Sequence, residues 1–196
     1  MVQIVIMWKK FKQLVTFPHS ANDSSDFHFR PFAFKLQQET LQVMKAKTDE
    51  ITNLLLLEEK VYNGATPWSA AIFQVELIKK DSLYLVVYHG SRLVAMIGMR
   101  KMNTEAHVTN IMVDPEWQHQ GLGTYLMKLM IDYAQKANCS FISLEVRIDN
   151  ENAKKLYQAL GFTVKLVRPN YYQDVHKDGL NMVLDLTTQK KGIDFG

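Results

Sequence analysis

The segment Gln118-His119-Gln120-Gly121-Leu122-Gly123-Thr124 lies between a stretch typical of a β-strand, residues 107–113, and a stretch typical of an α-helix, residues 121–137. Glycine lets the backbone approach a ligand closely and take a positive φ. The N-terminus of a helix presents unpaired N–H groups at the positive end of its dipole. A strand that leads through glycines into a helix therefore predicts a phosphate or pyrophosphate site, in a fold where strands and helices alternate.

Two common phosphate-binding motifs do not fit this segment. The dinucleotide fingerprint requires a glycine or alanine three positions after the second glycine, where this chain has Leu126. A nucleoside-triphosphate loop requires a Gly-Lys-Ser/Thr triplet, which does not follow Gly123. Taken alone, the two glycines indicate a ligand only weakly, because glycines at such a junction often serve to make a tight turn.

The rest of the chain alternates between strand and helix patterns. These patterns predict strands over residues 28–34, 83–88, 93–100, 107–113, 141–147, 162–167 and 180–186, and helices over residues 48–62, 66–78, 121–137 and 152–160. We expect Thr48 and Thr66 to cap the first two helices, with Pro67 at the first position of the second. His89-Gly90-Ser91 predicts a hairpin, and the helix over residues 121–137 predicts a parallel crossover.

Length and composition fit one mid-sized domain with a sizeable core, because 47% of the 196 residues are hydrophobic and 22% are charged. No apolar stretch approaches the roughly 18 residues that span a bilayer, so no membrane span is expected. Three of the 23 basic residues precede the first acidic residue, Asp23, and the other 20 are matched by 20 acidic residues. Without a basic excess in the body of the chain, nucleic-acid binding is disfavoured.

The cysteine and histidine content bounds the redox and metal chemistry. Cys139 is the only cysteine, so no intrachain disulfide is available, and a cytoplasmic location is expected. It follows a predicted helix C-terminus, where the helix dipole does not activate a thiol, so we expect a buried structural thiol rather than an acyl-carrying nucleophile. The six histidines show no metal-ligand spacing, and no metal site is predicted.

Residues 1–27 differ from the rest of the chain. Apolar side chains recur there at helical spacing opposite lysines, which is an amphipathic pattern. The segment is interpreted as a dispensable extension, with a helix that binds a membrane surface or a partner protein as the alternative. It ends in a polar linker. We expect one domain over residues 28–186 and a C-terminal tail over residues 187–196.

Further motifs follow the glycine segment. They are Leu144-Glu145-Val146-Arg147, Asn150-x-x-Ala153-x-x-Leu156-Tyr157, Leu160-Gly161-Phe162 and Asn170-Tyr171-Tyr172. With Gln118-x-x-Gly121-x-Gly123 and Pro67-Trp68-Ser69, they resemble the GNAT superfamily of acetyl-CoA-dependent N-acetyltransferases. Within it they are similar to the RimI type, which acetylates the N-terminal alanine of a small-subunit ribosomal protein. The resemblance implies an α/β fold with a mixed, centrally splayed sheet flanked by helices.

The resemblance also implies site residues. The positions that would bind acetyl-CoA are Ile111, Met112 and Val113 for the pantetheine arm, His119, Gln120, Gly121, Leu122, Gly123 and Thr124 for the pyrophosphate, and Asn150. Glu145 would be the general base for the incoming amine, and Tyr157 would protonate the departing thiolate. Both residue types suit these roles, because a free α-amine has a pKa of about 8 and a tyrosine a pKa of about 10. Tyr171 and Tyr172 would line the acceptor side.

The residues alone also allow plainer roles. Strand alternation places Glu145 on a polar face, where it would be solvated or paired with Arg147. Tyr157 would be a packing aromatic, and Trp68 would only fix the start of the second helix.

The cofactor loop departs from the family pattern at two positions. His119 and Thr124 replace arginines common in similar enzymes, so we expect a lower cofactor affinity that depends more on backbone N–H groups.

The expected acceptor is a protein N-terminus, such as that of a ribosomal protein. Asp178-Gly179-Leu180 departs from the Asp-Ala pattern of the RimI type, and acceptor choice resides in variable loops. A small amine, such as a polyamine or an aminoglycoside, is therefore an alternative acceptor. A non-catalytic acetyl-CoA-binding module is a further alternative, which the presence of both Glu145 and Tyr157 disfavours.

Overall fold

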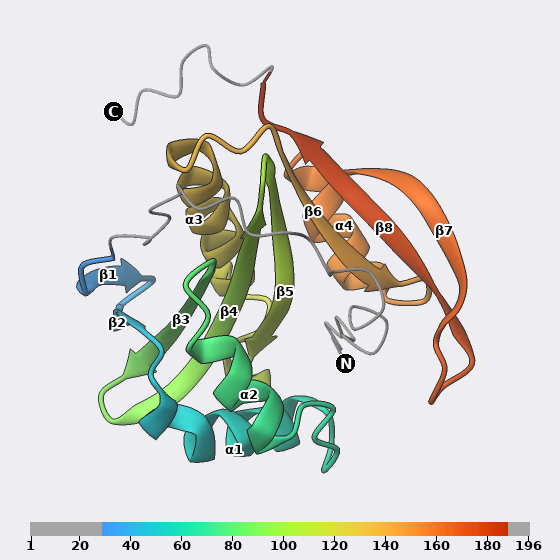
Figure 1. The fold of residues 1–196 in the computed structure, drawn as a ribbon. Helices are drawn as coiled ribbons and strands as arrows, with labels where there is room; N and C mark the ends of the chain where they lie inside the picture. Colours follow the sequence, from blue (N-terminus) through green and yellow to red (C-terminus); the bar gives the residue numbers. More distant parts are fainter. Residues whose placement is uncertain (1–28, 188–196) are drawn as a thin grey trace.

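The computed structural model describes residues 29–187, which form one eight-stranded sheet flanked by helices (Figure 1). The strands are β1 (Phe32–Leu36), β2 (Glu39–Lys45), β3 (Ser82–His89), β4 (Arg92–Met102), β5 (Glu105–Val113), β6 (Phe141–Arg147), β7 (Thr163–Tyr172) and β8 (Lys177–Asp185). The helices are α1 (Ile51–Val61), α2 (Ala70–Leu77), α3 (Leu122–Lys136) and α4 (Glu151–Ala159). The segment 1–27 and residues 188–196 of the tail lie outside the described residues, and their roles stay predictions.

The sheet is split at its centre. Its strand order is β1-β2-β3-β4-β5-β6-β8-β7, and β5 and β6 are the parallel pair. Their pairing extends only from Glu105 to Val108 of β5, and beyond it the two strands spread apart, as Figure 1 shows. Residues 109–113 of β5 therefore continue with no partner strand on the β6 side. The expected mixed, centrally splayed sheet is confirmed.

Six of the eleven predicted elements lie within two residues of their expected ends. Among the strands, β1 begins at Phe32 rather than at residue 28, β7 continues to Tyr172, and β8 begins at Lys177. The β3–β4 hairpin turns at Gly90, which has a φ of 59°, and α3 follows Gly121 as expected. The sequence prediction missed β2, which pairs with both β1 and β3. The turn before β2 uses Gln37, at a φ of 56°, rather than a glycine. Such a turn carries no sequence signal of the usual kind.

The first helix starts later than predicted. Residues Thr48–Glu50 form a separate 3-10 turn, and α1 begins at Ile51 without a side-chain cap. Glu50, directly before α1, accepts hydrogen bonds from Asn53 and from the hydroxyl of Tyr88. The expected cap at Thr48 is therefore wrong.

The second helix also starts later. It begins at Ala70, where Ser69 Oγ accepts the N–H of Ile72 over 3.4 Å. Thr66 and Pro67 lie in the preceding loop. That loop is tied to α1, because the backbone N–H of the buried Trp68 donates to Glu58 Oε1 over 3.0 Å. The expected cap at Thr66, with Pro67 as the first helical residue, is wrong.

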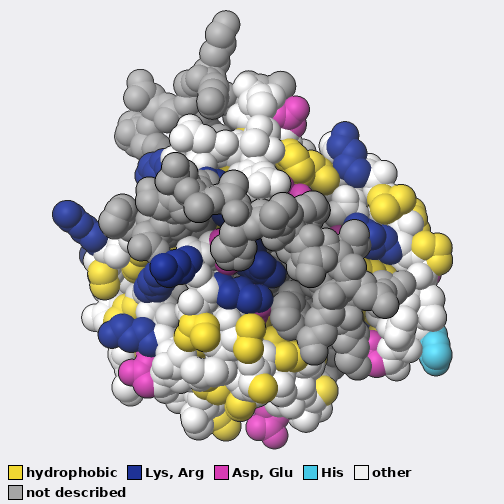
Figure 2. Space-filling model, in the orientation of Figure 1, with side chains coloured by type: hydrophobic (Ala, Val, Ile, Leu, Met, Phe, Trp, Pro, Cys, Tyr) yellow, Lys and Arg dark blue, Asp and Glu magenta, His cyan; other side chains and the backbone are white. Residues whose placement is uncertain are grey.

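Two apolar cores lie on opposite faces of the sheet. One contains residues of α3 and α4, and the other contains residues of α1 and α2. On β5, Ile111 and Val113 face the first core and Met112 faces the second, as strand alternation requires. Figure 2 shows exposed apolar side chains over α1 and α2 and again over β7. Among the described helices, none has the length and hydropathy of a membrane-spanning segment.

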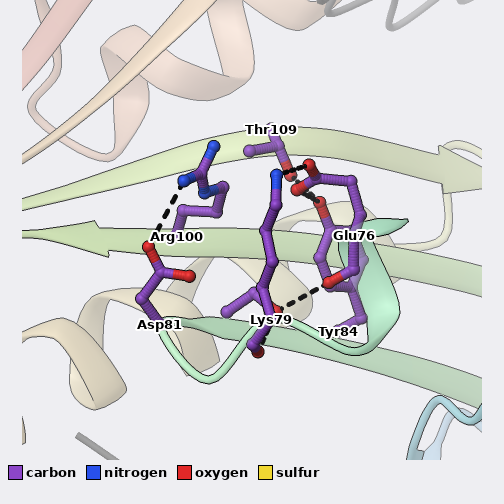
Figure 3. A network of polar contacts seen from close by, with 7 residues as sticks. Glu76, Lys79, Asp81, Tyr84, Arg100 and Thr109 are labelled. Atoms are coloured by element: carbon purple, nitrogen blue, oxygen red, sulfur yellow. Dashed lines mark hydrogen bonds and ion pairs between the residues drawn. The ribbon is translucent and has the colours of Figure 1, made fainter. Parts of the chain in front are cut away.

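A polar network fastens α2 to the sheet (Figure 3). The buried Glu76 of α2 pairs with Lys79 and accepts a hydrogen bond from the Tyr84 hydroxyl over 3.0 Å. Tyr84 also shares a hydrogen bond of 2.8 Å with Thr109 of β5. The ring of Tyr84 lies so close to Gly98 of β4 that a Cβ there would fall 2.0 Å from a ring carbon. The residue at this point of β4 must therefore be glycine.

Candidate active site

A cavity of about 270 Å³ opens where the free half of β5, the loop before α3 and the helix α4 meet. Its lining residues are Val61, Ile111, Val113, Gln118, His119, Gly121, Gly123, Thr124, Asn152, Lys155 and Leu156. Six of these are predicted cofactor-binding residues, namely Ile111, Val113, His119, Gly121, Gly123 and Thr124. The fold thus brings the glycine segment and the open edge of β5 to one site.

The loop before α3 takes its shape from one of its two glycines. Gly121 has a φ of 90° and directly precedes the helix, whereas Gly123 lies inside α3 without a positive φ. The space around Gly121 is open, since a Cβ there would meet nothing within 4 Å. Gln118 Nε2 donates to Val113 O over 2.8 Å, which ties the start of the loop to β5.

Three predicted contacts have side chains that point away from this cavity. Met112 packs in the core on the other face of the sheet, and Leu122 is buried beneath α3. Gln120 Nε2 donates to Glu116 O over 2.6 Å. A ligand in the cavity would therefore meet the backbone of these residues rather than their side chains.

Helix α4 supplies a wall of the cavity that the sequence prediction missed. Asn152, Lys155 and Leu156 line it, and their spacing of three and four residues places them on one helix face. This helical spacing is the sequence signal from which these cavity residues could have been predicted. Asn150, the predicted contact, caps α4 through Oδ1, which accepts the N–H of Ala153 over 3.3 Å. Its buried Nδ2 has no hydrogen-bond partner among the described residues.

Tyr157 of α4 does not line the cavity and packs in the core against Phe162, with the ring centroids 5.9 Å apart. Its side chain is fully buried, and its hydroxyl has no hydrogen-bond partner among the described residues. Burial raises its pKa above the ordinary value, so the hydroxyl keeps its proton at neutral pH. Burial is also the main cause that raises the pKa values of Tyr62 and Tyr172, with a smaller contribution from Tyr157. A buried hydroxyl without a partner is unusual in a folded protein.

Glu145 is the first residue of β6 beyond its ladder with β5, and its side chain is buried. Asn181 Nδ2 donates to its Oε1 over 3.1 Å, and Arg168 Nε lies 3.4 Å from the same oxygen. His107 Nε2 lies 3.2 Å from Oε2. Arg147 pairs instead with Asp149. The alternative of a solvated Glu145, or one paired with Arg147, is therefore wrong.

These contacts decide the charge of Glu145. Burial by itself would raise its pKa, but the nearby His107, with Asn181 and Arg168, holds the pKa below the ordinary value. Glu145 is consequently ionised at neutral pH. The sequence prediction missed His107, Arg168 and Asn181, because they come from β5, β7 and β8 and nothing in their spacing connects them to Glu145.

Tyr171 and Tyr172 differ in accessibility. Tyr171 is partly buried, and the guanidinium of Arg168 lies 5.9 Å from its ring centroid. Tyr172 is fully buried in the core formed with α1 and α2. Burial raises the pKa of both, with a further contribution from the nearby charge of Glu145. The end of β7 thus lies beside Glu145, with Tyr171 as the more accessible of the two phenols.

Other reactive groups remain outside the site. Cys139 is buried, and burial raises the pKa of its thiol, as expected for a structural cysteine. Over residues 29–187, no group of three or more His, Cys, Asp or Glu side chains could hold a metal ion.

The arrangement fits the ligand that the motifs imply. A helix N-terminus at an open glycine suits a pyrophosphate, and the free edge of β5 suits the amide groups of a pantetheine arm. The hydroxyl of Tyr157 and Nδ2 of Asn150 are buried donors that have no partner among the described residues. An ionised carboxylate and a protonated phenol are groups of the types that general base and general acid catalysis use.

Comparisons with known proteins agree with this geometry. Residues 48–162 match the acetyltransferase (GNAT) family. The ribosomal protein bS18-alanine N-acetyltransferase of Escherichia coli is 30% identical over 147 residues, covering 74% of this chain and 97% of the relative. The N-alpha-acetyltransferase RimI of Mycobacterium tuberculosis is 32% identical over 133 residues, covering 66% and 82%.

The fold comparison gives the same family. A crystal structure of the Escherichia coli enzyme matches this structure with a TM-score of 0.69 at 29% identity, covering 79% of this chain and 99% of that chain. The family match, which spans more than half of the chain, shows that this chain belongs to the GNAT family of acetyltransferases, enzymes that use acetyl-CoA as the acetyl donor.

Proposed function

We propose that this chain acetylates the N-terminal α-amine of a protein, with the N-terminal alanine of a small-subunit ribosomal protein as acceptor. One observation carries the chemistry: a buried, ionised Glu145 lies on β6 where the ladder with β5 ends, and the buried hydroxyl of Tyr157 keeps its proton and has no hydrogen-bond partner among the described residues. The acceptor class is supported by relatives named for alanine or α-amine acetylation, which align over most of their length.

The cavity supplies the binding site for acetyl-CoA in this proposal. The amides of residues 119–124 and the positive end of α3 hold the pyrophosphate, while the free backbone of residues 111–113 pairs with the pantetheine arm. Lys155 supplies a positive side chain at the same cavity, where His119 and Thr124 stand in place of the arginines expected in similar enzymes. The bound acetyl-CoA supplies the acetyl group as a reactive thioester.

Glu145 is the proposed general base. An N-terminal α-ammonium has a pKa of about 8, so a carboxylate held ionised needs to remove only one readily lost proton, directly or through water. Asn181 and Arg168 occupy Oε1 and fix the orientation of the carboxyl group.

Tyr157 is the proposed general acid. Its buried hydroxyl keeps its proton until the thiolate of coenzyme A departs, and it has no competing hydrogen-bond partner. Tyr171 and Tyr172 form the acceptor side of the site, with Tyr171 as the direct contact and Tyr172 as the residue that packs behind it.

The test is a panel of acceptors incubated with labelled acetyl-CoA and analysed by mass spectrometry. The panel contains a ribosomal-protein peptide with a free N-terminal alanine, the same peptide with its N-terminus blocked, a blocked peptide with one free lysine, and spermidine. We expect label on the free N-terminal alanine alone.

The other outcomes each overturn the proposal in a defined way. Label on spermidine or lysine in preference to the free N-terminus would replace the acceptor class. No label on any acceptor, together with calorimetric binding of coenzyme A, would support the non-catalytic alternative.

A further inference from the structure

A row of polar side chains runs from Glu145 across β6 and β5 to the surface. His107 Nε2 lies 3.2 Å from Glu145 Oε2, and His107 Nδ1 shares a hydrogen bond of 2.7 Å with Ser143 Oγ. Ser143 Oγ donates in turn to Glu105 Oε1. Glu145, His107 and Ser143 are all buried, whereas the side chain of Glu105 is 30% exposed.

The hydrogen-bond directions fix one proton on the imidazole ring. The hydroxyl of Ser143 has a single proton, which it donates to Glu105. At its other contact the same oxygen must accept, so His107 Nδ1 carries a proton. A neutral ring would then present a lone pair on Nε2 to the carboxylate oxygen of Glu145. Two acceptors 3.2 Å apart in a buried site repel, so a second proton belongs to the His107–Glu145 pair.

We propose that His107 is the positioning residue for Glu145: it holds this second proton as an imidazolium, and Ser143 and Glu105 fix its orientation. The inference rests on the proposed role of Glu145 as general base. An imidazolium at Oε2 offsets the burial that would otherwise protonate Glu145, so the base is ionised before the amine arrives. The lowered pKa of Glu145, in which burial is opposed first by His107, agrees with this.

Other groups around the pair act elsewhere. Those that face it are Arg100 of β4, Arg168, Tyr171 and Tyr172 of β7, and Asn181 of β8. Arg168 and Asn181 engage Oε1 rather than Oε2. Arg100, the register partner of His107, pairs with Asp81. Among the ion pairs that the structure shows for Glu145, the one at Oε2 is made by His107.

The direct test is nuclear magnetic resonance of the full chain labelled with ¹⁵N-histidine, with His107→Gln used to assign the His107 signals. We expect both ring nitrogens of His107 to carry a proton in the parent, and only Nδ1 to carry one in Glu145→Gln under the same conditions. A neutral ring protonated at Nε2 in the parent would overturn the inference.

Kinetics supply a second, independent readout. His107→Gln keeps a neutral donor near Glu145 but loses the charge, so the acid limb of the kcat/KM profile should move to higher pH by roughly one unit, with the rate recovering above it. Ser143→Ala removes the hydroxyl that fixes a proton on His107 Nδ1. This variant should move the acid limb of the kcat/KM profile to higher pH by less than His107→Gln does. A loss of rate that is equal at every pH would show that His107 is only structural.

Controls separate this inference from the proposed function. His89, the last residue of β3, forms an exposed pair with Glu39, in which Nε2 lies 2.7 Å from Oε2. His89→Gln is the matched control and should leave the pH profile of kcat/KM unchanged. If Glu145→Gln is fully active, Glu145 is not the base, whatever the protonation of His107. If Glu145→Gln is inactive while His107 is neutral, only the positioning role is lost.

Discussion

Asn181 of β8 stands directly opposite Glu145 of β6 in the antiparallel register, and its Nδ2 donates to Glu145 Oε1 over 3.1 Å. The orientation of the proposed base is thus set by the pairing of two strands rather than by a loop. A carboxyl group anchored in this way reorients little when an acceptor binds, which lowers the cost of reaching the reactive geometry.

Replacing Glu145 with glutamine should remove catalysis and spare binding. The variant keeps the shape of the side chain but has no proton acceptor of sufficient basicity, so kcat/KM should fall by roughly 10²-fold or more. Calorimetry should give nearly the parent affinity for coenzyme A. Parent-like turnover across the whole pH range would show that the carboxylate is structural.

Replacing Tyr157 with phenylalanine should separate proton donation from packing. The hydroxyl has no partner to lose, so the melting temperature should barely change, whereas kcat should fall by roughly 10-fold or more. The loss should be smaller for acyl donors with a more acidic thiol, because such a leaving group needs less protonation. An equal loss for all donors would point to general damage instead.

The two glycines of the cofactor loop should respond differently to alanine. Gly121→Ala places a Cβ on a backbone with a φ of 90°, which should cost about 1–2 kcal/mol of stability and weaken coenzyme A binding. Gly123→Ala puts its Cβ 3.4 Å from Leu156, an ordinary contact inside a helix, so the free energy of unfolding should not decrease.

Gly64→Ala is the matched control for this pair. Gly64 has a φ of 92° and open surroundings but does not line the cavity. Its variant should lose a similar amount of stability in thermal unfolding and keep the parent affinity for coenzyme A in calorimetry. If Gly64→Ala also weakens binding, strain alone explains the effect at Gly121.

Glu58 should make stability depend on pH. Burial raises its pKa from 4.5 to about 8, although the hydrogen bond from Trp68 opposes this. The folded protein then binds one proton more than the unfolded chain between these values, so the contribution is complete below about pH 4.5 and is lost as the pH rises through about 8. Glu58→Gln stays neutral and keeps an acceptor for Trp68.

Thermal unfolding across this range gives the measurement. The melting temperature of the parent should fall relative to that of Glu58→Gln as the pH rises from about 5 to about 9. Glu59→Gln, at the exposed neighbouring position, should follow the parent. Parallel curves for the parent and Glu58→Gln would show that the carboxyl group is not perturbed.

Local sequence signals predicted the elements whose ends are decided locally. The glycine at the start of α3, the Gly90 turn and the apolar alternation of β6 each fix a boundary through backbone geometry or side-chain period. They failed where distant contacts decide. Thr66 and Pro67 have the residue types of a helix start, but the bond from Trp68 to Glu58 holds this stretch as a loop.

The candidate site also has one part that local sequence predicts and another that distant contacts determine. Its cofactor-binding half is a single contiguous segment, so motif spacing locates it. The charge of Glu145 depends on His107, Arg168 and Asn181, which lie on three other strands and are brought together only by the strand order. Strand alternation alone placed Glu145 on a polar face of β6, where a solvated side chain would be expected. In the structure the side chain of Glu145 is buried.

The divergence of β5 from β6 has a consequence for hydrogen exchange. Central strands are ordinarily the slowest part of a sheet to exchange, because both edges are paired. In residues 110–113, only the edge that faces β4 is paired. Amides along this stretch should therefore alternate between slow and fast exchange in the free protein, and bound coenzyme A, by covering the second edge, should bring the fast amides up to the protection of their neighbours.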